Sequence, residues 1–228
     1  MWMLLACTAE KIVESSPPAD SPVEEVARAP LQFRFPLPDP ALFNQTVGVD
    51  HDPTDYEGAG EIVCSDYLGR QFPWCYDGHD GSDYLLIGGF DTMDSQDTPI
   101  LAALDGVVVE TDDGHYDRCH ATTDGVDCDG NPMQANFVIL EHEGGIRTKY
   151  WHMKKDSVAV VVGQAITCGD TLGLVGSSGN SSMPHLHFEV EDATGQVIDP
   201  YAGPMSQEET WWVEQGDPEG FPGLQCSD

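Results

Sequence analysis

From about residue 79 onward the chain consists of short β-branched segments interrupted by glycine, and this pattern constrains the fold more than any other feature. Residues 99–110 contain a β-branched run that breaks at Gly106, and residues 137–152 have the pattern of two strands about Gly144 and Gly145. Such spacing is typical of antiparallel hairpins. Further strands are expected at 157–162, 165–166, 172–175, 185–191 and 196–198. Because no long segment has a helical apolar period, we predict an all-β antiparallel sandwich or barrel-like domain.

The charge of the chain excludes several classes of partner. The 228 residues include 40 acidic and 9 basic side chains, which gives a formal net charge of -31. A chain of this charge repels phosphate backbones, so nucleic-acid binding is disfavoured, and anionic lipid surfaces are disfavoured for the same reason. Hydrophobic residues make up 40% of the sequence, which is enough for a packed core. No run of about 18 apolar residues is present, so no membrane-spanning helix is expected.

The cysteines indicate an oxidising compartment. The sequence Leu4-Leu5-Ala6-Cys7 resembles a bacterial lipobox, so we expect residues 1–7 to be part of an export signal, with a lipid anchor at Cys7 as the one membrane contact. The protein would then be periplasmic or on the cell surface. The other six cysteines fit three disulfides among fifteen possible pairings. Local pairing suggests Cys64–Cys75 and Cys119–Cys128, which leaves Cys168–Cys226. A thiolate metal site is disfavoured because no C-x-x-C spacing occurs.

Composition divides the chain into segments. Residues 8–30 are rich in serine, proline and glutamate and predict a flexible tether. Residues 31–76 are proline-rich and are expected to form an irregular cover packed on the main domain, which spans 77–205. Such a cover, placed ahead of the main domain, could also occlude part of it as an inhibitory segment. Residues 206–228 are expected to fold back as a tail pinned by Cys226.

An acidic insert at 111–136 interrupts the strand pattern. Asp124, Asp127, Asp129 and Asn131 could supply oxygen ligands to calcium, but their spacing does not match the EF-hand loop. A solvated acidic loop closed by its two cysteines is the favoured interpretation.

Histidines and one aspartate suggest a metal centre. His185 and His187 are two residues apart in a predicted strand and therefore face one side. His79 and Asp83 are four apart in a glycine-containing segment, and His152 closes a strand. Two imidazoles and one carboxylate would hold zinc with a fourth position open to water, which is the catalytic pattern. Zinc lowers the pKa of bound water to about 7, and the two remaining histidines could move protons or stabilise an oxyanion.

Three motifs in order resemble the lysostaphin/LytM-type zinc endopeptidases. They are His79-x-Gly81-x-Asp83, Tyr150-x-His152, and the Gly/Ser-rich segment from Gly176 that leads into Pro184-His185-Leu186-His187. The resemblance covers roughly residues 77–202. It implies that His79, Asp83 and His187 bind one zinc ion. It also implies that His152 and His185 are catalytic without binding the metal, activating water and stabilising the tetrahedral intermediate.

Other polar residues near these motifs have less certain roles. Glu189 could orient a zinc-ligating ring, or it could be a strand-edge charge. Asn180 and Ser181 could line a substrate groove. Either Tyr76 or Tyr84, which flank the first motif, could assist the oxyanion.

The resemblance implies a monomeric zinc metalloendopeptidase that hydrolyses peptide cross-links or stem peptides of bacterial peptidoglycan. Two alternatives stay open: a non-catalytic activator or scaffold of cell-wall hydrolases, and a zinc peptidase acting on Gly- or Ala-rich proteins outside the wall. The first is disfavoured because degenerate relatives generally lose metal ligands, whereas all three are retained here. The strong negative charge and the lack of a recognisable wall-binding module leave the substrate open. A β module that only binds is the least favoured interpretation.

Overall fold

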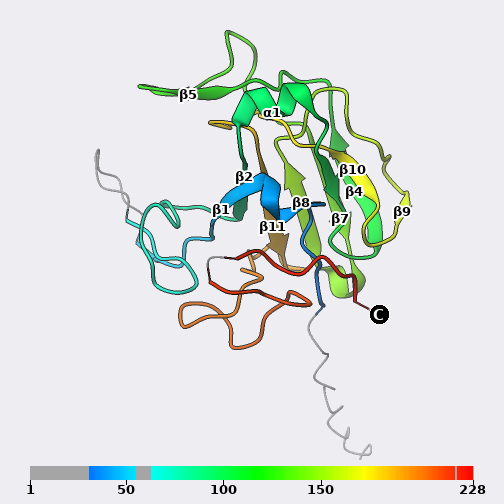
Figure 1. Cartoon of the computed structure of the whole chain (residues 1–228). Helices are drawn as coiled ribbons and strands as arrows, with labels where there is room; N and C mark the ends of the chain where they lie inside the picture. The colour runs from blue at the N-terminus through cyan, green and yellow to red at the C-terminus, as the bar shows by residue number, and fades with distance from the viewer. Residues whose placement is uncertain (1–30, 55–62, 219, 228) are drawn as a thin grey trace, which may run out of the picture.

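One antiparallel sheet organises the chain (Figure 1). A computed structural model describes residues 31–54, 63–218 and 220–227, so the expected signal at 1–7 and tether at 8–30 lie outside the described residues. The sheet has seven strands in the order β1 (Phe43–Val47), β2 (Ser82–Leu86), β11 (His185–Glu191), β8 (Arg147–Trp151), β7 (Phe137–Glu141), β4 (Gly106–Asp112) and β9 (Ala165–Ile166). All neighbouring strands in it are antiparallel.

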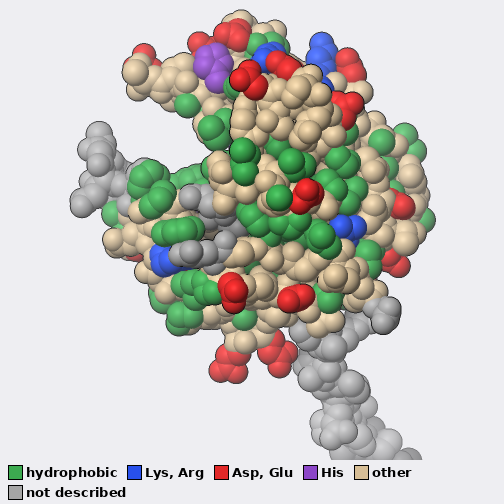
Figure 2. Space-filling view, viewed as in Figure 1, with side chains coloured by type: hydrophobic (Ala, Val, Ile, Leu, Met, Phe, Trp, Pro, Cys, Tyr) green, Lys and Arg blue, Asp and Glu red, His purple; other side chains and the backbone are tan. Residues whose placement is uncertain are grey.

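Smaller elements surround this sheet. β3 (Pro99–Leu101) pairs with β10 (Thr171–Leu174), and β5 (His120–Thr122) pairs with β6 (Gly125–Asp127). The helical elements are η1 (Pro40–Leu42), α1 (Gly89–Ser95) and η2 (Glu143–Gly145). The β5–β6 hairpin, which lies in the acidic insert, extends away from the body in Figure 1, and the face in Figure 2 is hollowed beneath it. Among the described residues, no helix has the length and apolarity that a membrane span requires.

The mostly β, antiparallel fold is confirmed, but some expected elements differ. Residues 157–162 form no strand, because Val161 and Val162 lie exposed in the turn before Gly163 instead of pairing. Residues 196–198 contribute one isolated bridge, Glu191 to Val197. The helix α1 is an unpredicted element, because its seven residues bury one side chain and are too short to show an apolar period.

The N-terminal segment and the C-terminal tail pack together on the core. The backbone N–H of Phe33 donates to the Trp211 carbonyl at 2.7 Å, and that of Val213 donates to the Phe33 carbonyl at 2.9 Å. Trp212 is fully buried and packs against Phe188 of β11, with 5.7 Å between ring centroids. Burying each such ring contributes roughly 1.5–3 kcal/mol, so both chain ends stabilise the sheet that carries the site.

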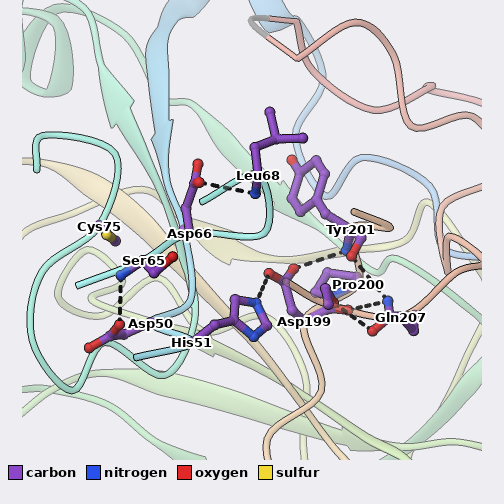
Figure 3. Close-up of polar contacts among 12 residues, drawn as sticks. Asp50, His51, Ser65, Asp66, Leu68, Cys75, Asp199, Pro200, Tyr201 and Gln207 are labelled. Carbon is purple, nitrogen blue, oxygen red and sulfur yellow. Dashed lines mark hydrogen bonds and ion pairs between the residues drawn. The ribbon is translucent and has the colours of Figure 1, made fainter. Parts of the chain in front are cut away.

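The segment at 31–76 is more regular than expected. It supplies β1, which pairs with β2 at the edge of the sheet. Polar contacts also fix it to the C-terminal part of the chain, as Figure 3 shows: His51 Nε2 lies 2.8 Å from Asp199 Oδ2, and Asp199 Oδ1 accepts from the Tyr201 N–H. The described part of this segment is therefore built into the fold.

Three disulfides close the loops, and their pairing agrees with the one suggested by proximity. Cys64–Cys75 lies in the N-terminal segment, Cys119–Cys128 flanks the β5–β6 hairpin, and Cys168–Cys226 joins the tail to the loop after β9. In the chain-entropy account each bridge contributes roughly 2–4 kcal/mol.

Candidate functional site

The residues expected to bind zinc meet where β2 and β11 pair. Strand register places Asp83 directly opposite His187, and His79 lies in the turn that leads into β2. The Asp83 Oδ1 atom is 2.9 Å from His187 Nδ1 and 3.2 Å from His79 Nε2. The two ring nitrogens are themselves 3.2 Å apart. All three side chains are buried.

This donor set fits zinc. The three ligand atoms are close enough to share one ion, and two imidazoles with one carboxylate are a common set in catalytic zinc sites. The orientation of His79 also suits this role, because its Nδ1 lies 2.7 Å from the Gly48 carbonyl. A carbonyl can only accept, so Nδ1 carries the proton and Nε2 has a free lone pair for a metal.

Gly81 explains why the first motif contains glycine. A Cβ atom added there would lie 2.6 Å from His187 Nε2 and 2.8 Å from the Phe188 carbonyl oxygen. Any side chain would therefore collide with the His187 ring and with the backbone of β11. The absence of a Cβ lets the turn between His79 and Asp83 pass directly against His187.

The two other expected histidines lie beside this group. His152 and His185 have ring centroids 4.6 Å apart, and His152 is 5.9 Å from His187 by the same measure. Each uses Nδ1 to donate to a backbone carbonyl at 2.7 Å, His152 to Ser178 and His185 to Met183. Each Nε2 therefore has no proton when the ring is neutral, and the structure brings all five expected residues together.

The surroundings set the protonation of these groups. Burial favours the neutral form of Asp83, but the nearby His185 and His79 hold its pKa well below the usual range. Burial lowers the pKa of His152 well below normal, and the neighbouring His185 and His187 lower it further. Burial alone would lower the pKa of His187, but its contacts with Asp80 and Asp83 raise it to about 10. His152 is thus held neutral, as a proton acceptor must be.

A cleft of about 290 Å³ opens onto the site. Its lining consists of Tyr76, Asp80, Lys149, Trp151, His152, Asn180, His187 and Glu189. Sequence reasoning missed Asp80, Lys149 and Trp151. Strand alternation could have predicted the last two. Lys149 lies opposite Glu189 and Trp151 lies opposite His187 in the β8–β11 pairing, so both share the face of the site.

The structure separates the two tyrosines. Tyr76 lines the cleft, with its ring centroid 4.2 Å from that of His79. Tyr84 is fully buried, and its hydroxyl lies 3.1 Å from that of Tyr201. Since Tyr84 follows Asp83 in the same strand, it faces the core when Asp83 faces the site. Tyr76 is therefore the tyrosine that a substrate can reach.

The remaining candidates also differ in position. Asn180 lines the cleft, whereas Ser181 is buried, with its hydroxyl 2.8 Å from that of Ser177 and 3.2 Å from His185 Nδ1. Glu189 is buried and forms an ion pair with Lys149 at 3.0 Å. It is thus a paired charge on the site face of β11.

The carboxylates of the acidic insert make local contacts. The Asp127 carboxylate accepts from the backbone N–H of Asp129, and the Asp129 carboxylate accepts from the Tyr116 hydroxyl. Calcium binding here stays a prediction.

Comparisons with known proteins identify the family of the chain and several relatives. The model of Peptidase family M23 matches residues 87–200, which is half of the chain. Peptidoglycan DD-endopeptidase ShyA of Vibrio cholerae is 31% identical over 112 residues, which are 49% of this chain and 20% of that protein. DD-carboxypeptidase/endopeptidase Mpg of Neisseria meningitidis is 30% identical over 118 residues, 51% of this chain and 22% of that protein.

The chain thus matches about a fifth of the length of these relatives. Among solved structures, the catalytic domain of lysostaphin from Staphylococcus simulans is 26% identical, with a TM-score of 0.37, over 54% of this chain and 76% of that chain. The family match contains His152, His185 and His187 and begins after His79 and Asp83. Because that match extends over half of its residues, the chain belongs to peptidase family M23.

Proposed function

We propose that this protein is a zinc-dependent endopeptidase that hydrolyses peptide bonds in the cross-links or stem peptides of bacterial peptidoglycan. The observation that carries the proposal is the group of three donor side chains and two further imidazoles beside one cleft, which His152 and His187 line. Three donor atoms lie within 3.2 Å of one another, and two further imidazoles lie beside them, each held by a backbone carbonyl at Nδ1. A chain that served as a scaffold would need none of this arrangement.

Each residue has a chemical role in this proposal. Bound by His79, Asp83 and His187, zinc would supply Lewis acidity and an acidified water. His152, held neutral by burial, accepts a proton from the attacking water at Nε2 and returns it to the leaving amine. The Tyr76 hydroxyl donates to the developing oxyanion, and a His185 ring protonated at Nε2 would do the same.

The substrate class is supported by the relatives. Two of them are named for DD-endopeptidase or DD-carboxypeptidase activity, one of these explicitly on peptidoglycan. A wall substrate places the protein outside the cytoplasm, where its three disulfides are stable. A lipid anchor at Cys7 and a monomeric state complete the proposal.

The alternative of a peptidase acting on proteins outside the wall has one observation in its favour. The formal net charge of -31 opposes approach to an anionic polymer. Salt weakens this repulsion, so a wall enzyme should become faster as ionic strength rises. A peptidase acting on neutral Gly- or Ala-rich proteins should show little salt dependence.

The test is a digest of purified sacculi by the oxidised, zinc-loaded full chain, with mass spectrometry of the released fragments. We expect chelator-sensitive release of uncross-linked peptides, and the fragment masses identify the scissile bond. Asp83→Asn is the inactive control, and Gly- or Ala-rich polypeptides form the second substrate panel. Cleavage of the polypeptides but of no sacculus would favour the peptidase acting on proteins outside the wall. Cleavage of neither would overturn both hypotheses.

A further inference from the structure

The His187 ring has carboxylates at both of its edges. At Nδ1, the Asp83 carboxylate lies 2.9 Å away on the side where the expected zinc ligands converge. At Nε2, the Asp80 carboxylate lies 3.4 Å away. Asp80 belongs to the same short turn as Gly81, whose missing side chain lets the turn contact that edge of the ring. One turn therefore encloses this imidazole from both sides.

Besides Asp83, two carboxylates, those of Asp80 and Glu189, each have an oxygen within 4.8 Å of a ring nitrogen of His187. Lys149 distinguishes them. Its ammonium lies 3.0 Å from Glu189 and 2.6 Å from Glu191, so the Glu189 charge is already compensated. Within the described residues, the one ion pair of Asp80 is with His187. Asp80 is thus the carboxylate available to the ring.

We propose that Asp80 is a positioning residue that accepts the Nε2–H of His187 and thereby holds the ring with Nδ1 unprotonated and aimed at zinc. This inference rests on the proposed zinc site. A carboxylate behind a metal-bound imidazole fixes the tautomer and the ring orientation and makes the ligand more basic. For His79, the backbone carbonyl of Gly48 accepts the Nδ1 proton and orients the ring in the same way. The two imidazole ligands are therefore oriented by different kinds of acceptor.

The same three residues do not make a good second metal site. Asp80, His187 and Glu189 are close enough to share an ion, but the Lys149 ammonium lies against Glu189 and would repel a second cation. A second metal would also have to displace the Nε2 proton of a ring already bound at Nδ1. The positioning role requires neither change.

The experiment measures zinc affinity of the full chain by competition with a chromophoric chelator. Asp80→Ala is expected to weaken zinc binding about 10- to 100-fold. Asp80→Asn should cost less, because its amide oxygen still accepts a hydrogen bond. Asp77→Asn, which removes one charge from the chain just before His79, is the matched control and should stay within about twofold of the wild type. Cobalt-substituted Asp80→Ala should have a shifted visible spectrum, which a loss of charge alone would not produce.

Fold integrity is checked by the thermal midpoint of the metal-free protein. The Asp80 side chain is 59% exposed, so losing its contact with His187 should lower that midpoint only slightly. Equal affinities of Asp80→Ala and Asp77→Asn would overturn the proposal. So would a second zinc equivalent in the wild type that Asp80→Ala loses, since Asp80 would then be a ligand. Tight zinc binding without hydrolysis of any substrate would refute the proposed function. The zinc affinities of Asp80→Ala and Asp77→Asn would still decide the present inference. A wild type that binds no zinc would overturn both.

Discussion

The two halves of the site are held in place by different means. In the half that we propose binds the metal, His79, Asp83 and His187 contact one another directly across two paired strands. In the other half, His152 and His185 are oriented by carbonyls of the 177–184 loop. The first half is therefore organised by its own side chains, whereas the second depends on the conformation of a loop.

The acidic insert supports that loop. The backbone N–H of Cys119 donates to the Ser177 carbonyl at 2.9 Å, and the Ser177 hydroxyl donates to the Cys119 carbonyl at 2.6 Å. Ala121 of β5 donates to the Ser182 carbonyl at 2.9 Å, and Asn136 at the end of the insert donates to the Ser178 hydroxyl. The insert contributes none of the five proposed site residues, yet it fixes the loop that orients two of them, His152 and His185. Metal binding and catalysis should be separable by mutation.

The largest effect is expected from Asp83→Asn. It removes the buried charge that the surrounding imidazoles stabilise, so zinc binding should be lost and the rate should fall by about 10³-fold or more. Zinc content by elemental analysis and the sacculus digest measure the two effects. Asp91→Asn, at an exposed position in α1, is the charge-matched control. Retention of stoichiometric zinc by Asp83→Asn would remove Asp83 from the ligand set.

His152→Ala and His185→Ala test the other half. Each should retain zinc and lose about 10²- to 10⁴-fold in rate, because proton transfer and oxyanion stabilisation are lost while the metal ligands remain. Rates and zinc affinity are measured on the same preparations. If either variant lost zinc together with activity, the two halves would not be separable as argued.

Breaking the Cys119–Cys128 bridge, by replacing both cysteines with serine, should disturb catalysis through the loop. We expect a rate lower by about 10- to 100-fold, as small misplacements of catalytic groups produce, with zinc affinity unchanged. The matched control replaces Cys168 and Cys226. From sequence separations of 9 and 58 residues, the losses of stability are about 3 and about 4 kcal/mol respectively. The control should therefore melt lower yet retain the wild-type rate, and a rate loss that followed stability would contradict the loop argument.

The same contrast explains how much the sequence could predict. His79 with Asp83, and His185 with His187, are local spacings, so strand alternation and motif order suffice to identify them. The orientation of His79 by Gly48 could not be foreseen, since a backbone carbonyl 31 positions away has no side-chain signature. The sequence alone could not distinguish Tyr76 from Tyr84. The distinction depends on where β2 begins, at Ser82, because the strand register decides which side chain faces the core.

Errors in the strand prediction have a similar origin. Residues 157–162 are rich in valine, which favours strands, but β-propensity reflects packing on a pleated surface. Here Val161 and Val162 have no such surface, with 68% and 61% of their area exposed. The support that the insert gives to the 177–184 loop could not be predicted either. Its acidic composition indicates solvation, whereas its support of the loop comes mainly from backbone hydrogen bonds.

The smallest expected effect concerns His142, a histidine outside the site. It is a change in how the free energy of unfolding depends on pH. His142 is buried, with Nδ1 2.7 Å from the Asp105 carbonyl and Nε2 2.7 Å from the Thr148 hydroxyl. Burial lowers its pKa below the ordinary value of 6.5. The unfolded chain therefore takes up this proton first as pH falls, so stability is intact above pH 6.5 and declines between 6.5 and the lowered pKa of the folded state.

The slope for this one group is at most about 1.4 kcal/mol per pH unit. Urea unfolding of the wild type and of His142→Asn between pH 5 and pH 8 should show a shallower decline in the variant. At pH 8 the variant should bind zinc with wild-type affinity, because His142 lies outside both halves of the site. Equal slopes in the two proteins would mean that His142 is not the group whose protonation is linked to unfolding. The acid sensitivity would then be assigned to His152, whose pKa burial also lowers.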